Sequence, residues 1–177
     1  MKRTIFSLFL LSVLVLVGCA GTADTSTPSV PTTETDTIKI GSISPLTGDA
    51  AAYGLPLQQA AELAVSEINA EGGVLGKTLE IAYEDGKCEG KSASSAAQKL
   101  INVDKVTVIL GGLCSGETLG AAPITEAAQV ILFSAASGSP DVTTAGDFVF
   151  RNFPSDASSA SKVAKYQSKT KIVGIAH

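Results

Sequence analysis

The sequence is poor in the residues on which most catalytic sites and nucleic-acid interfaces depend. Its 177 residues include no tryptophan, one methionine and a single histidine, His177, and only 5% of them are aromatic. Charged residues make up 17%, and the formal net charge is −4. Nucleic-acid binding needs clustered cations that displace counterions from the phosphates. Because the sequence contains no such cluster, we exclude a nucleic-acid partner.

Motifs of nucleophilic catalysis and of phosphate binding are lacking as well. Residues 112–116 spell GLCSG, not G-x-S-x-G, and no histidine other than His177 is available to activate Ser115. Neither G-x-x-x-x-G-K-[ST] nor G-x-G-x-x-G follows a predicted strand. Glu84 and Asp85 adjoin each other after a strand, where a surface charge pair is the favoured interpretation over an acid/base pair. We therefore predict that the chain is not an enzyme and binds no cofactor.

Residues 1–18 have the composition of a secretory leader. Lys2 and Arg3 precede an apolar run over residues 5–17 that only two serines interrupt. A membrane-spanning helix needs about 20 apolar residues, so this run is too short to be one and fits a leader that is removed on export. It ends in Leu-Val-Gly-Cys at Cys19, which resembles the lipobox of bacterial lipoproteins. That resemblance implies cleavage before Cys19, lipid on its thiol, and anchoring to the outer face of the cytoplasmic membrane or elsewhere in the periplasm and cell envelope. The alternative is an uncleaved anchor with an incidental cysteine.

Residues 19–36 form a linker between the lipid and the rest of the chain. They are rich in Thr, Ser and Pro and contain almost no apolar side chains. Such a segment cannot bury enough surface to offset the entropy of ordering. We therefore predict that it is disordered.

Two cysteines remain when Cys19 carries lipid. Cys88 and Cys114 are an even number in an oxidising compartment, where disulfides form and persist. A disulfide between them would close a loop of about 25 residues and stabilise the fold by about 3 kcal/mol. The alternatives are two free thiols or a pair of metal ligands, but His177 is the only histidine and the chain has no C-x-x-C pair. We predict a disulfide and no metal site.

From residue 37 onward, short β-branched segments alternate with longer segments of helical periodicity. Strands are predicted at residues 37–43, 78–83, 106–110, 130–133, 148–150 and 171–176. Helices are predicted from a first turn that contains Pro56 to the Gly72-Gly73 stop, over residues 92–103, over residues 115–128 either continuously or with an interruption at Pro123, and from Ser155 or Asp156 onward. The run at residues 106–110 is apolar throughout, as in a central strand buried on both faces. This alternation implies βαβ crossovers, an α/β fold class and a parallel sheet with helices on both faces.

Ligands on such sheets bind beyond the carboxyl ends of the strands. Here those ends are residues 44–53, 88–90, 111–115 and 134–140, which are rich in Gly, Ser and Ala, so that backbone groups can approach a ligand closely. We interpret them as a binding rim, with ordinary surface loops as the alternative. Ser115 stands where a helix begins, and a helix N-terminus offers unpaired N–H groups and a positive dipole end to a carboxylate. A plain N-cap serine explains that position equally well.

Several segments together resemble the branched-chain amino acid (leucine/isoleucine/valine) solute-binding proteins of ABC importers. In chain order they are IKIG at residues 38–41, PLTG and YG at 45–48 and 53–54, AAELAVSEINAEGG at 60–73, YED with a cysteine at 83–88, GGLCS at 111–115, and FSAASGSP at 133–140. The resemblance runs from about residue 37 to residue 176. It implies the two-lobed clamshell of periplasmic binding proteins, with the ligand between the lobes.

The resemblance also assigns domains and roles. Residues 37–150 would form the N-terminal ligand-binding lobe, and residues 151–177 the crossover and the start of a second lobe that is mostly missing, because family members are much longer. Cys88 and Cys114 correspond to the family's disulfide, and Ser115 to the serine that binds the ligand α-carboxylate. The carbonyl group of Ala136 would accept a hydrogen bond from the α-ammonium group, and Tyr53 would lie against the ligand side chain.

One position departs from the family. Gly138 stands where a threonine commonly contacts the α-amino or carboxylate group of the ligand. The backbone N–H of Gly138 remains, but the hydroxyl group is lost unless Ser137 or Ser139 replaces it. Related members take amides, short-chain acids or aromatic acids, so the departure leaves the ligand class open.

The expected function is capture of a small amino-acid-like solute outside the cytoplasm and its delivery to an ABC permease. Membrane contact would come only through the lipid on Cys19, and a tethered receptor stays near its permease at a high effective concentration. The alternatives are a sensory receptor of the same fold that feeds a signalling partner, an amide or short-chain carboxylate as ligand, and a secreted enzyme of another α/β family.

Overall fold

The computed structural model of the protein describes residues 36–170. Its elements are β1 (Thr37–Ser44), α2 (Ala51–Ala70), β2 (Thr78–Asp85), α3 (Gly90–Asn102), β3 (Val108–Gly111), α4 (Ser115–Ala128), β4 (Ile131–Ser134), the 3-10 helix η1 (Pro140–Thr144), β5 (Val149–Arg151) and α5 (Asp156–Thr170). The predicted leader, the lipidation at Cys19, nearly all of the linker and the strand at residues 171–176 lie outside the described residues. Within them, no helix is both long enough and apolar enough to cross a membrane.

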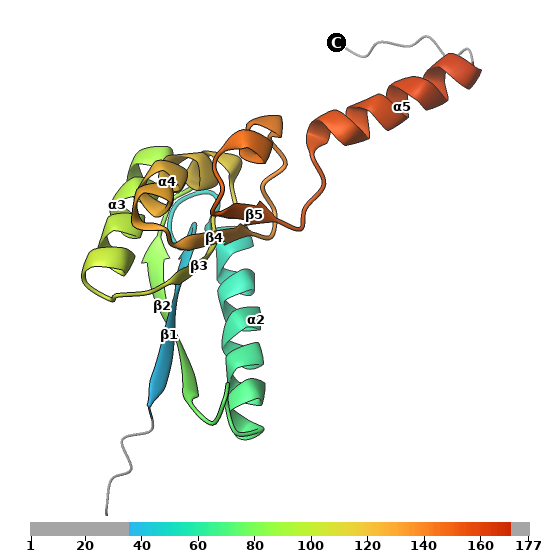
Figure 1. The fold of residues 1–177 in the computed structure, drawn as a ribbon. Helices are drawn as coiled ribbons and strands as arrows, with labels where there is room; N and C mark the ends of the chain where they lie inside the picture. The colour runs from blue at the N-terminus through green and yellow to red at the C-terminus, as the bar shows by residue number, and fades with distance from the viewer. Residues whose placement is uncertain (1–35, 171–177) are drawn as a thin grey trace, which may run out of the picture. The chain divides into compact units, whose positions relative to one another are not determined.

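The five strands form one sheet in the order β2-β1-β3-β4-β5, and every neighbouring pair is parallel. Helices connect most consecutive strands, because parallel neighbours need a crossover rather than a hairpin. Figure 1 shows α3 and α4 on one side of this sheet and α2 on the other. The predicted α/β class and parallel sheet are therefore confirmed.

The hydrophobic core lies between the sheet and the pair α3 and α4. Ile43, Ile109 and Leu132 from three strands are fully buried, as are Ala97 and Leu100 on α3. Alanines on both helices let the helices pack closely on each other and on the branched side chains of the strands. This packing fixes the carboxyl ends of β1, β3 and β4 relative to one another.

The opposite face of the sheet is covered less completely. Ser42, Leu110 and Phe133 are neighbours in register on β1, β3 and β4 and face α2. On α2 only Gly54 is buried, and Leu57 of its predicted apolar stripe is 38% exposed. The prediction that β3 is buried on both faces is therefore wrong for the described residues, because α2 alone does not close this side.

The predicted start of the first helix was wrong, whereas the predicted limits of α4 are confirmed. Helix α2 begins five residues before Pro56, and its first turn follows directly from the turn in which the amide of Ala51 donates to the carbonyl oxygen of Gly48, 3.1 Å away. Helix α4 continues through Pro123 without interruption. A proline removes one intrahelical hydrogen bond and crowds the preceding turn. In α4 the burial of Ala121, Ala122 and Thr125 outweighs that loss, because tertiary packing supplies most helical stability.

Candidate functional site

The loops after β3 and β4 meet at the carboxyl end of the sheet. The amide of Ser139 donates a hydrogen bond to Oγ of Ser115, 3.1 Å away, and so joins the start of α4 to the loop of residues 135–139. Parallel strands bring their carboxyl ends to one edge, where ligands of such sheets bind. This hydrogen bond thus brings together two of the four segments that the sequence assigned to the binding rim.

Ser115 is not the N-cap of α4. Cys114 holds that position with extended backbone angles, and Ser115 is the first helical residue. Its hydroxyl oxygen accepts from Ser139 rather than from its own helix. The hydroxyl proton therefore remains able to donate to an anion near the helix N-terminus, where the dipole favours negative charge. The capping explanation of Ser115 is thereby removed, while its ligand contact stays a prediction.

A buried cluster of hydroxyl groups links the loops that form this rim. Thr118, Ser134 and Ser137 are fully buried around the carbonyl oxygen of Gly112, which lies 2.7 Å from Oγ of Ser134 and 3.1 Å from Oγ of Ser137. Oγ of Ser137 also lies 2.7 Å from Oγ1 of Thr118. The hydroxyl group of Ser137 thus has internal partners, so binding a ligand through it would require giving up part of this network. Its predicted ligand contact remains untested.

The guanidinium of Arg151 holds the outer side of the same loop. It donates to the carbonyl oxygens of Ser137 and Ser139, at 3.1 and 2.7 Å. Among residues 36–170, the carbonyl oxygen of Ala136 and the amide of Gly138 have no hydrogen-bond partner. Buried N–H groups without partners are rare, and Gly138 is buried. These two groups are the backbone donor and acceptor that the sequence assigned to the ligand.

A disulfide joins Cys88 to Cys114, with Cα atoms 5.3 Å apart. It connects the loop after β2 to the residue that precedes Ser115. The structure therefore contains the predicted pairing, in place of free thiols or metal ligands.

The Glu117 side chain accepts hydrogen bonds from the backbone amides of the same two cysteines. This carboxylate is fully buried in the first turn of α4, and it accepts from the amide of Cys88 at 3.0 Å and from that of Cys114 at 3.1 Å. Gly86 and Gly112 leave it room, because a Cβ on either would collide with the Glu117 side chain. Burial raises the pKa of Glu117, and the hydrogen bonds from the amides of Cys114, Cys88 and Leu113 offset that rise only in part.

Asp85 fixes the loop that follows β1. Its carboxylate accepts from the amide of Leu46 at 2.9 Å and from the hydroxyl group of Thr47 at 2.5 Å. Burial acts to raise the pKa of Asp85, but these bonds and the amide of Lys87 outweigh it and hold the pKa below its usual value. Glu84 instead pairs with Lys99. The two acids therefore have structural partners, consistent with a charged surface pair rather than an acid/base pair.

Tyr53 lies at the same end of the sheet but stands apart from the other candidates. It is on the first turn of α2 and is 73% exposed. No hydrogen bond of the described residues links it to Ser115 or to the loop of residues 135–139. Its predicted contact with a ligand side chain stays a prediction.

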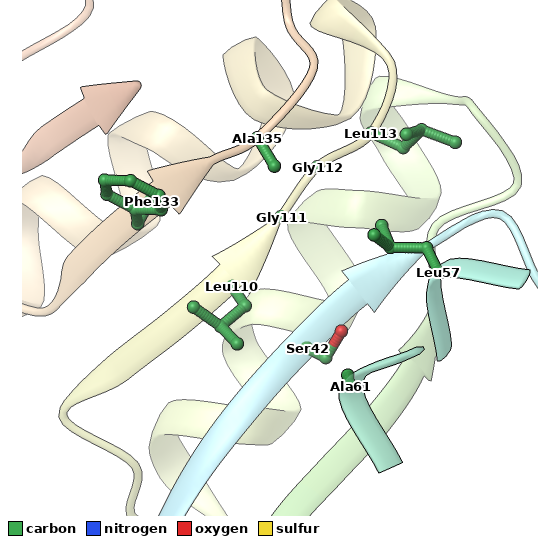
Figure 2. Close-up of a pocket in the computed structure, with 9 residues that line it drawn as sticks. All are labelled: Ser42, Leu57, Ala61, Leu110, Gly111, Gly112, Leu113, Phe133 and Ala135. Atoms are coloured by element: carbon green, nitrogen blue, oxygen red, sulfur yellow. The ribbon is translucent and has the colours of Figure 1, made fainter. Parts of the chain in front are cut away.

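An apolar groove runs from the rim along the α2 face of the sheet. Figure 2 shows Leu110 and Phe133 from neighbouring strands and Leu57 and Ala61 from α2 around it, with Ala135 at the rim end. Ser115 and Ala136 are not among its lining residues. The groove is thus continuous with the rim loops but does not include Ser115 and Ala136, which the family resemblance assigned to the ligand.

Sequence reasoning missed Glu117, Arg151 and the cluster around Thr118. Glu117 stands three residues after Cys114, the spacing at which an acidic side chain reaches back to a helix N-terminus. That spacing was the available signal for Glu117. The bonds of Arg151 reach back over 8 to 14 residues of the chain, to positions on and before η1, so no local sequence pattern predicts them.

A sequence model of the family described as Periplasmic binding protein matches residues 37–177. The chain belongs to the periplasmic binding protein family.

Several family members are similar over most of this chain. The Leu/Ile/Val-binding protein of Escherichia coli K12 is 33% identical over 132 residues, which are 74% of this chain and 36% of that protein. The structure of LivJ from Streptococcus pneumoniae in complex with isoleucine is 37% identical with a TM-score of 0.66, over 69% of this chain and 35% of that one. The structure of a solute-binding protein of Rhodopseudomonas palustris in complex with 3,4-dihydroxybenzoic acid is 31% identical with a TM-score of 0.68, over 76% of this chain and 37% of that one. The chain thus spans little more than a third of the length of these periplasmic binding proteins.

Proposed function

We propose that this chain forms the N-terminal ligand-binding lobe of an exported solute-binding protein that captures a small amino-acid-like solute for an ABC importer. The observation that carries the proposal is the pair of unpartnered backbone groups at the rim, the amide of Gly138 and the carbonyl oxygen of Ala136. They lie on the loop that Ser115 joins through Ser139. A donor for a carboxylate and an acceptor for an ammonium on one loop suit the two charged ends of an amino acid.

Export and anchoring are part of the same proposal. The leader of residues 1–18 and the lipid on Cys19 would keep the receptor at the cell envelope, beside its permease. The Cys88–Cys114 disulfide supports an oxidising compartment, since disulfides persist there and are rare in the cytosol.

An aromatic carboxylate is the second candidate ligand. The R. palustris protein, in complex with 3,4-dihydroxybenzoic acid, is 31% identical to this chain. The groove beside the rim is lined by Leu57, Leu110 and Phe133, which would suit an aromatic ring. Such a ligand would use the rim's donors but would leave the carbonyl oxygen of Ala136 without a partner.

Isothermal titration of the complete protein separates these candidates. The panel is L-isoleucine, L-alanine, acetamide, butyrate and 3,4-dihydroxybenzoate. We expect saturable binding of an amino acid, with the ligands that lack an ammonium group at least roughly 10-fold weaker, because each loses a hydrogen bond to a charged group. Tighter binding of 3,4-dihydroxybenzoate would favour the second candidate, and no binding by any of the five would contradict the proposal.

A further inference from the structure

The hydroxyl groups of the two serines that flank Gly138 have hydrogen-bond partners of their own. The hydroxyl group of Ser137 is buried among Thr118, Ser134 and the carbonyl oxygen of Gly112. That of Ser139 accepts from the amide of Asp141 at 3.3 Å. Neither side chain therefore occupies the space beside the Cα atom of Gly138.

A carboxylate from another segment occupies that space. A Cβ atom placed on Gly138 would lie 2.6 Å from Oδ1 and 2.7 Å from Oδ2 of Asp156, the first residue of α5. The amide of Asp156 also donates to the carbonyl oxygen of Gly138, 2.9 Å away. The missing side chain of Gly138 thus leaves the room that the carboxylate of Asp156 occupies.

Asp156 is exposed to solvent. Among the described residues, Asp156 forms no ion pair and its side chain accepts no hydrogen bond. Arg151 donates to the carbonyl oxygens of Ser137 and Ser139 and to the hydroxyl group of Thr143, not to Asp156. A ligand that carries an ammonium group beside this loop would supply the Asp156 carboxylate with a donor, whereas a ligand with a carboxylate alone would not.

We propose that Asp156 is a specificity-determining residue, whose carboxylate accepts hydrogen bonds from the ammonium group of an α-amino acid together with the carbonyl oxygen of Ala136. The proposal rests on the proposed function of the rim as the ligand site, and it names the ligand class that this rim selects. The competing explanation is an acidic residue that only stabilises the first turn of α5 through the helix dipole. That role would affect stability and not the choice between ligands.

Asp156→Asn in the complete protein separates the two roles. The probes for titration are L-isoleucine and 3-methylpentanoate, which is isoleucine without its ammonium group. Asp141→Asn, an exposed aspartate in the first turn of η1, is the matched control. We expect Asp156→Asn to weaken isoleucine binding roughly 10- to 100-fold, to leave 3-methylpentanoate binding unchanged or tighter, and Asp141→Asn to change neither.

The outcomes keep this inference distinct from the proposed function. If the wild-type protein binds isoleucine and Asp156→Asn binds it equally well, or loses both ligands to the same extent, the role of Asp156 is refuted while the rim remains the ligand site. Wild-type binding of 3-methylpentanoate as tight as that of isoleucine would likewise refute selection by Asp156. If the wild-type protein binds neither probe nor any other amino acid, the proposed function fails and this inference fails with it. Thermal unfolding of each variant checks that the fold is intact.

Discussion

Glu117→Ala should lower the free energy of unfolding by about 3–5 kcal/mol, because it leaves the amides of Cys88 and Cys114 buried without an acceptor and opens a cavity. The carboxylate is fully buried, so water does not replace it readily. Urea unfolding of the two proteins, followed by circular dichroism, measures the difference. Glu67→Ala, at an exposed glutamate on α2, is the control and should change stability by less than about 0.5 kcal/mol.

Glu117→Gln tests whether the charge itself matters. Because burial raises the pKa of Glu117 above its ordinary 4.5, the folded state holds this proton more tightly than the unfolded state. Above about pH 4.5 the Glu117 side chain therefore binds fewer protons in the unfolded state than in the folded state. The free energy of unfolding of the wild type, relative to that of Glu117→Gln, should then fall as the pH rises. If the stability of the wild type relative to Glu117→Gln stays constant or increases between pH 4.5 and pH 7, the raised pKa of Glu117 is contradicted.

Replacing Cys88 and Cys114 together by serine should lower the free energy of unfolding by about 3 kcal/mol. The disulfide closes a loop with a sequence separation of 26, and cross-linking restricts the unfolded chain more than the folded one. Urea unfolding with and without reductant measures the effect. Reductant should destabilise the wild type by a similar amount and leave the double-serine variant unchanged.

The disulfide and Glu117 hold the same two loops, so their effects should not add. In a triple variant that combines Glu117→Ala with Cys88→Ser and Cys114→Ser, the loss of unfolding free energy should differ from the sum of the two separate losses, as for groups in one network. Strict additivity would mean that Glu117 and the disulfide stabilise the rim independently. Two free thiols in the intact mass of the exported protein would contradict the disulfide itself.

The sequence predicted the strands and helices of these residues better than the polar contacts among their loops. The alternation of β-branched and helical segments was enough for the parallel sheet, because period and length distinguish strands from crossover helices. The strand ends located the rim, and the unpartnered groups of Ala136 and Gly138 lie on it.

The polar interior of the rim could not be predicted in the same way. Glu117 has the sequence context of an exposed acid in a helix first turn, and only the packing of Gly86 and Gly112 against it makes it a buried acceptor. The exposed Asp156 is the first residue of α5, and the hydrogen bond from its amide to the carbonyl oxygen of Gly138 depends on how two loops meet. Such contacts are set by tertiary structure, which local periodicity does not encode.

The central claim is that Ser115 and its neighbouring loop bind the polar end of a small solute. Titration of L-isoleucine into the complete protein and its Ser115→Ala variant tests it most directly, with Ser95→Ala on the exposed side of α3 as control. We predict a loss of about 1.5–3 kcal/mol in binding free energy for Ser115→Ala, as for a hydrogen bond to a charged group, and no change for Ser95→Ala. An unchanged affinity for isoleucine in Ser115→Ala would contradict the claim.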